Sequence, residues 1–549
     1  MNQETKICQN CKNQFEIKPD DFAFYEKIQI SSPEICPDCR SENRLAFWPF
    51  GKFHKRTCSL TGEKIISIFP PQTRFPVYKN TNWYSDKWEP SYLDYDPNRP
   101  FFDQLYELQN KSPRPHQFGT QNQNCDYSDD VWESKNCYLC RSLVDCENVS
   151  YSYRVLHCRD SYDLFYCYDI EQSYDCAYCF KLFNVKYALD VRDSFDSSFL
   201  YDCRNVRNCF MCWNLRNKEY HILNKPYSKE DYQKKLKEYN LGSWQSVKKL
   251  EKEFQALLQN EAIHRTNHNF KITNSTGDYL LECKNCHSCY FYETSENCAY
   301  VFRGLGNKDS QDGNGIWKAE LIYDVCQLTD GYKLLHSNYC TNCRESEYLD
   351  FCVDCESCFG CVGLQKKRYC ILNKQYSETD YKKLVIEIRE KMKSEGTYGR
   401  FLPYRLATCG YNLSLSGIIY PKTREKVENL NGVWEEEEKP NLDGLNIYPF
   451  LDDIKDVGEG ITEKALVCEE TGRAFNITKD ELKFLKIHEI PLPRHYPDVR
   501  TRRRFGRLFR IAPSETKCCF CSRPVIHFYQ PELGYKRIAC TDCYQNKVI

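Results

Sequence analysis

Residues 136–167 read NCYLCRSLVDCENVSYSYRVLHCRDSYDLFYC and belong to a loose repeat of 11 to 13 residues that continues to residue 227. Each row of the repeat begins with Asn, Asp or Ser and then alternates small and large residues. Polar turn residues followed by a short alternating run are typical of a β-strand. Strands at this tight, regular spacing predict a β-solenoid, in which small residues stack inside successive coils.

The repeat block occurs twice in the chain. Shifting the sequence by 149 aligns NCFMCWNLRNKEYHILNKPYS at 208–228 with SCFGCVGLQKKRYCILNKQYS at 357–377. At the inner positions small residues interchange, and Ser150, for example, aligns with Ala299. Such exchange is expected of small buried residues and not of metal ligands. We therefore predict cysteine-rich repeat blocks over 118–265 and 267–396.

Each repeat block is expected to end in a surface helix. Ser228 stands three residues before Asp231, and Ser377 stands three residues before Asp380. This spacing is typical of an N-cap residue and its partner in the first helical turn.

The two ends of the chain are also copies of each other. A shift of 460 aligns PEICPDCRSENR at 33–44 with PRHYPDVRTRRR at 493–504, and both keep Pro-Asp and two arginines. The cysteines of the first copy are replaced in the second. The predicted organisation is an end module at 1–90, the two repeat blocks, a connecting segment at 400–465, and a second end module at 466–549.

The composition limits the class of protein. At 549 residues the chain is too long for one core, and its 76 basic and 77 acidic residues give no global charge that favours nucleic acid or membrane. It contains no apolar run of about 20 residues, and its first residues lack the apolar core of a signal peptide. We expect no membrane partner and a reducing cytoplasm, where 35 cysteines serve as metal ligands or buried residues.

Two complete sets of four cysteines lie in the end modules, each built from two Cys-x2-Cys pairs. Their members are Cys8, Cys11, Cys36 and Cys39, and Cys518, Cys521, Cys540 and Cys543. Two thiolates from each of two turns supply the closed tetrahedral shell that Zn²⁺ favours in structural sites. The sequence therefore predicts two structural zinc ions. A knuckle pair followed by a helix resembles the treble-clef and zinc-ribbon group.

A second set in each end module has lost ligands. Its positions are Cys58, Thr61, Asn80 and Trp83 in the first module, and Cys468, Thr471, Tyr496 and Val499 in the second. Apolar replacements such as Trp83 and Val499 indicate that packing has taken the place of metal. Each module is therefore expected to keep one metal site.

The central run Cys352, Cys355, Cys358 and Cys361 offers a possible additional metal site. Its spacing is similar to the cysteine runs that hold iron–sulfur clusters, although its last gap is one residue short. The aligned positions in the first block include Val206, so one copy lacks a ligand. We favour packed cysteines over an iron–sulfur cluster, with metal bound by the second block alone as the open alternative.

Arginines are concentrated in the C-terminal module, and the candidate nucleic-acid contacts are Arg500, Arg502, Arg503, Arg504, Arg507 and Arg510. On a helix most of them would form one basic stripe that neutralises phosphates and stacks on RNA bases. The alternative is a solvated helix face, or pairing with the acidic run at 435–438.

The whole combination resembles an uncharacterised family of cysteine-rich zinc-ribbon proteins common in ultra-small bacteria. The motifs that carry the resemblance are the initial Cys-x2-Cys and CPDCR knuckles, the NCF-x-C and ILNKQYS repeats, and the IPLPRHYPDVR and CTDCY end. In that family Thr61, Thr471, Tyr496 and Val499 are often cysteine. The resemblance strengthens the expected architecture and implies no activity.

We expect a multi-domain, β-rich fold with duplicated treble-clef or zinc-ribbon modules flanking a duplicated cysteine-rich, β-solenoid-like centre with surface helices. No phosphate-binding loop, nucleophile elbow or HExxH motif is present, so an enzyme is not expected. The leading function is a zinc-stabilised, non-catalytic protein that contacts RNA, DNA or a ribonucleoprotein through the C-terminal module. The alternatives are a protein–protein scaffold whose zinc modules cap the solenoid, and metal storage or redox work by the central cysteines.

Overall fold

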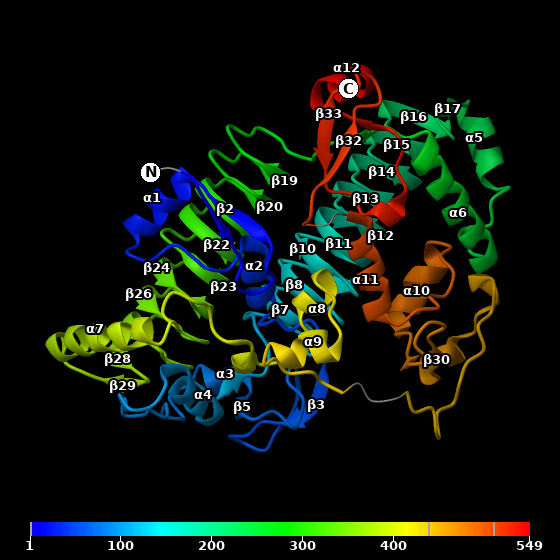
Figure 1. Cartoon of the computed structure of the whole chain (residues 1–549). Coiled ribbons are helices and arrows are strands. Elements are labelled where there is room, and N and C mark those ends of the chain that lie inside the picture. The colour runs from blue at the N-terminus through cyan, green and yellow to red at the C-terminus, as the bar shows by residue number, and fades with distance from the viewer. Residues whose placement is uncertain (1–2, 437–439, 509–510) are drawn as a thin grey trace. The chain divides into compact units, whose positions relative to one another are not determined.

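The computed structural model describes residues 3–436, 440–508 and 511–549. The chain divides into two compact units, of which unit 1 comprises Met1–Gln117 and Asn267–Glu436, and unit 2 comprises Phe118–Thr266 and Glu437–Ile549. Each unit joins one end module to one repeat block: the first module to the second block, and the second module to the first block (Figure 1). The predicted connecting segment at 400–465 is divided between the units.

Each repeat block forms one sheet of eleven strands. In unit 2 the strands are β7 (Asp129–Trp132), β8 (Arg141–Val144), β9 (Glu147–Ser150), β10 (Tyr153–Leu156), β11 (Arg159–Glu171), β12 (Tyr174–Ala177), β13 (Phe180–Leu189), β14 (Arg192–Tyr201), β15 (Arg204–Trp213), β16 (Arg216–Ile222) and β17 (Lys225–Pro226). In unit 1 they are β19 (Gly277–Leu281), β20 (Cys289–Glu293), β21 (Glu296–Leu305), β22 (Lys308–Trp317), β23 (Tyr323–Thr329), β24 (Tyr332–Leu335), β25 (Asn338–Thr341), β26 (Arg344–Glu347), β27 (Glu356–Phe359), β28 (Arg368–Ile371) and β29 (Lys374–Gln375).

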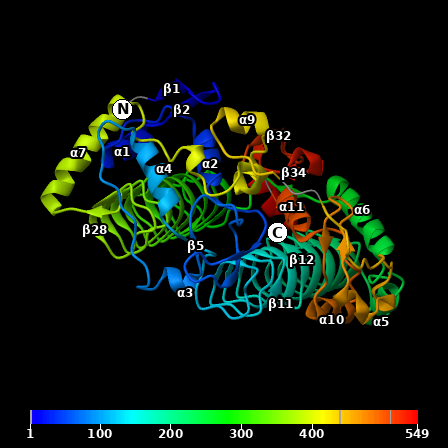
Figure 2. The same ribbon diagram turned by 90° about the horizontal axis from the view of Figure 1, so that it is seen from below.

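Neighbouring strands in both sheets pair in parallel with a register of twelve residues, as in Phe180↔Arg192 of unit 2 and Glu296↔Lys308 of unit 1. An antiparallel pair ends each sheet, β16 with β17 and β28 with β29. Figure 2 shows the strands of the second unit following one another in successive turns of the chain. The predicted repeat of 11 to 13 residues is therefore a structural step of twelve.

Within each step the chain turns at every third residue. The φ angles of Asn136, Leu139, Ser142 and Asp145 are 54°, 51°, 58° and 48°, and the same spacing continues along both blocks. The next residue after each such corner points inward and is buried, as are Cys137 and Cys140. The predicted alternation of small and large residues was wrong because a corner every three residues turns each third side chain to the inside.

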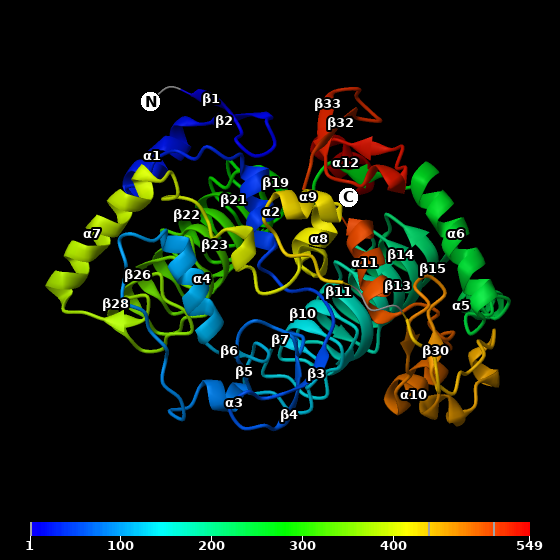
Figure 3. The same ribbon diagram turned by 60° about the horizontal axis from the view of Figure 1, so that its bottom comes forward.

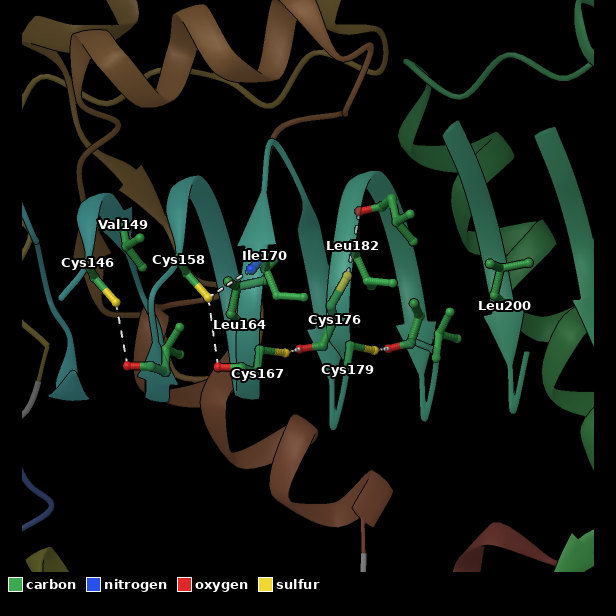
Figure 4. Close-up of a cluster of buried hydrophobic side chains, with 14 of the residues drawn as sticks. Cys146, Val149, Cys158, Leu164, Cys167, Ile170, Cys176, Cys179, Leu182 and Leu200 are labelled. Atoms are coloured by element: carbon green, nitrogen blue, oxygen red, sulfur yellow. Dashed lines mark hydrogen bonds between the residues drawn. The ribbon is translucent and has the colours of Figure 1, made fainter. Parts of the chain in front are cut away.

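The interior combines aliphatic side chains with cysteines and serines, and the polar atoms of the latter bond to the backbone (Figure 4). The Sγ atom of Cys158 lies 3.2 Å from the carbonyl oxygen of Leu156 and 3.8 Å from that of Cys167. Ser161 Oγ donates to Arg159 O at 2.7 Å and accepts from the amide of Ser173 at 3.0 Å. Cysteine and serine can interchange inside because each satisfies its polar atom locally.

The end modules contain four small antiparallel hairpins, each followed by a helix. The hairpins are β1 (Glu4–Ile7) with β2 (Gln14–Ile17), β3 (His54–Thr57) with β4 (Lys64–Ser67), β30 (Leu466–Val467) with β31 (Ala474–Phe475), and β32 (Ser514–Lys517) with β33 (Pro524–His527). The helices of the modules are α1 (Pro19–Lys27), α2 (Pro37–Leu45), α3 (Asn80–Trp83), α4 (Phe101–Lys111), α10 (Lys479–Ile487), α11 (Pro497–Leu508) and α12 (Thr541–Val548).

One helix of each module lies against the side of a sheet. In unit 1 helix α2 contacts β21, β22 and β23, and in unit 2 helix α11 contacts β11 and β12 (Figure 3). These strands lie in the middle of their sheets, so α2 and α11 do not cap them.

The helices that follow the repeat blocks begin where the sequence predicts. They are α5 (Lys229–Leu236) and α6 (Trp244–Asn260) in unit 2, and α7 (Glu378–Ser394) in unit 1. Ser228 and Ser377 cap α5 and α7 by accepting the amides of Asp231 and Asp380 at 3.0 and 3.1 Å, which confirms both N-caps. Among the described residues, no helix has the length and apolar character needed to cross a membrane.

Candidate metal centres and basic groove

The first metal centre lies between the β1–β2 turn and the start of α2. Cys8 and Cys11 come from the turn, whereas Cys36 caps α2 and Cys39 lies in its first turn. The Sγ atoms of Cys11 and Cys36 are 3.7 Å apart, and the Cys36 amide donates to Cys8 Sγ at 3.3 Å. Hydrogen bonding by the Cys39 thiol lowers the pKa of Cys36 to about 5. The same hydrogen bond raises the pKa of Cys39, so in the absence of metal one thiolate of this pair is favoured.

The second centre repeats this arrangement at the C-terminus. Cys518 and Cys521 come from the β32–β33 turn, and Cys540 caps α12 with Cys543 in its first turn. Cys521 and Cys540 are again 3.7 Å apart between their Sγ atoms, and the Cys540 amide donates to Cys518 Sγ at 3.3 Å. Burial opposes ionisation, but backbone amides lower the pKa of Cys518 to about 6.

Both centres fit a tetrahedral metal. In each set the four sulfur atoms all lie within 4.8 Å of one another. A metal–sulfur distance of about 2.3 Å in a tetrahedron places sulfur atoms about 3.8 Å apart, which agrees with the two spacings above. Two four-cysteine groups that can hold a metal ion are thus confirmed, one at each end of the chain, and they are the groups found in the part of the chain that the structure describes.

In the two incomplete cysteine sets, larger apolar or aromatic side chains stand where ligands would be. Trp83 is buried, and its Nε1 donates to the carbonyl of Pro113 at 3.1 Å. Val499 is also buried, and Tyr496 lies under the guanidinium of Arg473, 3.7 Å from the ring centre. The contact between Arg473 and Tyr496 joins the β30–β31 turn to the segment before α11, where the aligned module places a cysteine site.

The central run Cys352, Cys355, Cys358 and Cys361 occupies four successive inner positions of one twelve-residue step. The Sγ atoms of Cys352 and Cys355 lie 3.4 and 3.3 Å from the carbonyl oxygens of Cys361 and Leu364. The structure does not bring the four sulfurs together as it does in the end modules. Their Cys-x2-Cys spacing follows from the three-residue period.

Two arginines kept in both end modules form buried ion pairs with the sheets. In unit 2, Arg500 Nη1 lies 2.6 Å from Asp163 Oδ2, and Arg504 Nη1 lies 2.8 Å from Asp163 Oδ1. Arg500 and Arg504 are only 8% and 3% exposed. Buried charges persist only when paired, so these two arginines attach α11 to the sheet.

Unit 1 contains the same arrangement at aligned positions. Arg40 Nη2 lies 2.7 Å from Asp312 Oδ2, and Arg44 Nη1 lies 2.6 Å from Asp324 Oδ1. Arg40 and Arg44 precede Arg500 and Arg504 by 460 positions, and Asp312 follows Asp163 by 149. The Pro-Asp-x-Arg pattern shared by the two modules therefore supplies an arginine that attaches each helix to its sheet. The cysteines beside it in the first module do not take part in this attachment, and the second module lacks them.

The predicted basic stripe is consequently not an open face. Arg500 and Arg504 point into unit 2 and are unavailable to nucleic acid. Arg503 pairs with Glu470 and Arg507 with Asp175, both at 2.9 Å, but each side chain stays partly exposed. Arg502 is exposed, whereas Arg510 lies outside the described residues.

The partly exposed arginines line a groove between α6 and α11 of unit 2. Two adjoining cavities of about 90 and 480 Å³ share Asp175, Tyr187, Lys248, Glu251 and Arg507 in their linings. Further cations and aromatic rings complete the walls: Trp244, Lys252, Arg494, Arg503 and Tyr535. The sequence did not place Lys248 and Lys252 beside the arginines, because more than 200 residues separate them along the chain.

Unit 1 covers the corresponding face of α2 with its own chain. Asn43 Nδ2 donates to the carbonyl of Leu402 at 3.2 Å, and the ring of Phe47 meets that of Phe401 at 5.0 Å. The aligned positions in unit 2 are Arg503 and Arg507, which face the groove.

No protein-family model matches the chain, and no curated protein is significantly similar to it. The resemblance to a cysteine-rich zinc-ribbon family stays a prediction from the motifs.

Proposed function

We propose that this protein is a non-catalytic binding scaffold in which zinc occupies both four-cysteine centres and each sheet is the wall of a β-solenoid. The closed all-sulfur donor sets support zinc in a structural role, since catalytic zinc keeps an open coordination position and usually has His or carboxylate ligands. The hairpin–helix modules would then be treble-clef or zinc-ribbon units. The many free cysteines suit a reducing compartment such as the cytoplasm.

Metal analysis tests the zinc assignment directly. Protein purified without oxygen should contain about two zinc ions per chain, one for each four-cysteine group, and no iron. Iron with visible absorbance, or several additional zinc ions, would indicate that the central cysteines bind metal and would overturn this part of the proposal.

The proposed ligand of the scaffold is single-stranded nucleic acid, bound in the groove between α6 and α11. The observation that carries it is that unit 2 leaves open, and lines with cations, a helix face that unit 1 covers. Lys248, Arg503 and Arg507 can neutralise phosphates, and Trp244 offers a ring on which a base can stack. Arg500 and Arg504 have no part in this contact because they are buried.

Binding of fluorescein-labelled oligouridylate, followed by anisotropy at several salt concentrations, tests this function. The variant Lys248→Glu/Lys252→Glu/Arg503→Glu, all three at the groove, should weaken binding and lower the slope of log K against log[salt] by about 2, since each contact to a single strand contributes about 0.7. The control Lys229→Glu/Lys234→Glu/Lys237→Glu makes the same charge change on or just after α5. Equal affinity in both variants, or binding that does not respond to salt, would refute the proposal.

A second candidate function, a protein–protein scaffold, is favoured by one surface feature. Phe183 and Phe195 pair across β13 and β14, and both are exposed although they are large apolar residues. Glu171 and Arg207 precede and follow them in the same row. An apolar pair between charges is typical of a protein contact.

A further inference from the structure

A second cavity of unit 2 has a different chemistry from the basic groove. It has a volume of about 760 Å³ and lies between the first strands of the sheet and α10. Its lining combines amides, carboxylates and aromatic rings, and includes Asn124, Asn136, Asn148, Tyr127, Tyr162 and Phe484. We call this cavity the amide trough.

The floor of the amide trough is a ladder of asparagines, one for each twelve-residue step. Asn124 Nδ2 donates to Asn136 Oδ1 at 3.0 Å, and Asn136 donates in the same way to Asn148 at 2.9 Å. Asn148 donates to Asp160 Oδ1 at 2.7 Å and ends the ladder on a carboxylate. A carboxamide offers two N–H donors and two oxygen lone pairs, so each rung keeps one of each for a ligand.

The spacing of these groups suits an extended polymer. Neighbouring strands lie about 4.8 Å apart, so donors and acceptors recur at that interval along the trough. This interval is close to the length of one sugar ring in an extended glycan, whose hydroxyl groups both donate and accept hydrogen bonds.

The walls of the trough supply apolar surface for such a ligand. The rings of Tyr127 and Tyr138 are half-buried and lie 5.6 Å apart, whereas Tyr162 and Phe484 are buried against each other with their rings 4.6 Å apart. Ile487 on the rim is 64% exposed. Aromatic and aliphatic faces beside hydrogen-bonding groups match the apolar faces and polar edges of sugar rings.

The charge of the trough selects against phosphate polymers. Asp126, Asp160 and Asp480 line it, against Lys483 and His488. Burial and the nearby Lys186 lower the pKa of His488 to about 4, so this imidazole is neutral at physiological pH. The carboxylates therefore outnumber the cations, which favours an uncharged ligand over nucleic acid.

Unit 1 contains the same asparagine ladder, but there a lysine from α1 binds the aspartate that ends it. Asn297 Nδ2 donates to Asp309 at 2.9 Å, and Lys27 Nζ of α1 binds the other oxygen of Asp309 at 2.8 Å. The residue aligned with Lys27 in unit 2 is Ile487, which has no charge to offer to Asp160. The bridge that crosses the ladder in unit 1 is thus absent at the aligned position of unit 2.

We propose that the amide trough of unit 2 binds an uncharged, extended oligosaccharide. Its hydroxyl groups would bond to the asparagine ladder, and its ring faces would pack on Tyr127 and Tyr138. This site is separate from the basic groove, so either proposal can fail without the other.

Isothermal titration of the full-length, metal-loaded protein tests the site with three unbranched hexasaccharides: β-1,4-linked glucose, β-1,4-linked N-acetylglucosamine and α-1,4-linked glucose. At least one should bind with a Kd of about 1 mM or lower. The variant Ile487→Lys should recreate the bridge to the ladder carboxylate and abolish binding. The control Ile526→Lys places the same charge at another exposed isoleucine of unit 2, on β33, and should bind normally.

Tyr127→Ala provides a second test that does not depend on the folding of Ile487→Lys. It removes one aromatic wall and should weaken binding about tenfold, or about 1.4 kcal/mol. Absence of binding by all three sugars at millimolar concentration would overturn the proposal. Unchanged affinity in Tyr127→Ala, or in a folded Ile487→Lys protein, would also overturn it.

Discussion

Replacing Arg44 by methionine should destabilise unit 1 more than any exposed substitution. Arg44 is fully buried, and its guanidinium lies 2.6 Å from Asp324 and 3.4 Å from Asp312. Asp312 keeps Arg40 at 2.7 Å, whereas Asp324 keeps only the imidazole of His336 at 3.4 Å among the described ion pairs. Removing one partner of a buried pair costs about 3–5 kcal/mol, because the other charge stays buried without compensation.

The pKa of Asp324 gives the reason for this cost. Burial would raise it, but the hydrogen bond from His336 and the charge of Arg44 hold it below its usual value. Without Arg44 the carboxyl group must take up a proton or leave the interior, and either change loosens α2 from β22 and β23. Asp324→Asn keeps a residue that tolerates its positive φ of 54° and removes the charge. The double variant Arg44→Met/Asp324→Asn should therefore be less destabilised than Arg44→Met alone.

Hydrogen exchange followed by mass spectrometry can measure this effect within one unit of a two-unit protein. Peptides from α2 and β22 should lose about 3 kcal/mol of protection in Arg44→Met, while peptides of unit 2 should be unchanged. Arg99→Met removes an exposed pair with Glu107 and serves as control, with an expected change below about 1 kcal/mol. A loss below about 1 kcal/mol in Arg44→Met would refute the docking role.

The other predictions concern the metal ligands and the pH dependence of unit 2. Cys36→Ser should reduce the zinc content from two ions to one by elemental analysis, whereas Cys58→Ser, in a degenerate set, should leave it unchanged. Burial raises the pKa of Glu481 to about 7, although Arg500 and the hydroxyl of Tyr151 lower it. Because this folded-state pKa exceeds the unfolded value of about 4.3, the stabilisation is complete below pH 4 and is lost as the pH rises towards 7. Glu481→Gln should remove this part of the pH dependence in urea unfolding, and an unchanged profile would contradict it.

Much of the metal chemistry could be predicted from local sequence. The eight ligands form two groups because each Cys-x2-Cys pair sits in a hairpin turn or at the first turn of a helix. Such pairs converge through short-range geometry, and their spacing is a strong signal. Trp83 and Val499, at the other positions of the paired sets, have apolar side chains that cannot bind a metal, and both are buried.

The sequence predicted which residues face the interior of the repeat blocks only in part. Cysteines are inside as expected, but leucines and isoleucines are inside as well, and the inward-facing positions recur at every third residue and not at every second. The missed signal is the recurrence of Asn and Asp at three-residue spacing, as at Asp202, Asn205 and Asn208. These residues tolerate the left-handed conformation that each corner requires. Tyr151 and Arg154 occupy the same kind of corner, which weakened the pattern.

The sequence by itself determined the nested duplication, the two four-cysteine sets and the retention of two arginines in each end module. Only the tertiary structure decided that the first module joins the second block and the second module joins the first. It also decided that Arg500 and Arg504 face buried aspartates and not a ligand. A run of arginines looks the same whether its partner is solvent, a phosphate or a carboxylate 337 residues away, as for Arg500 and Asp163. Charge is encoded locally, but burial is created only when distant segments pack together.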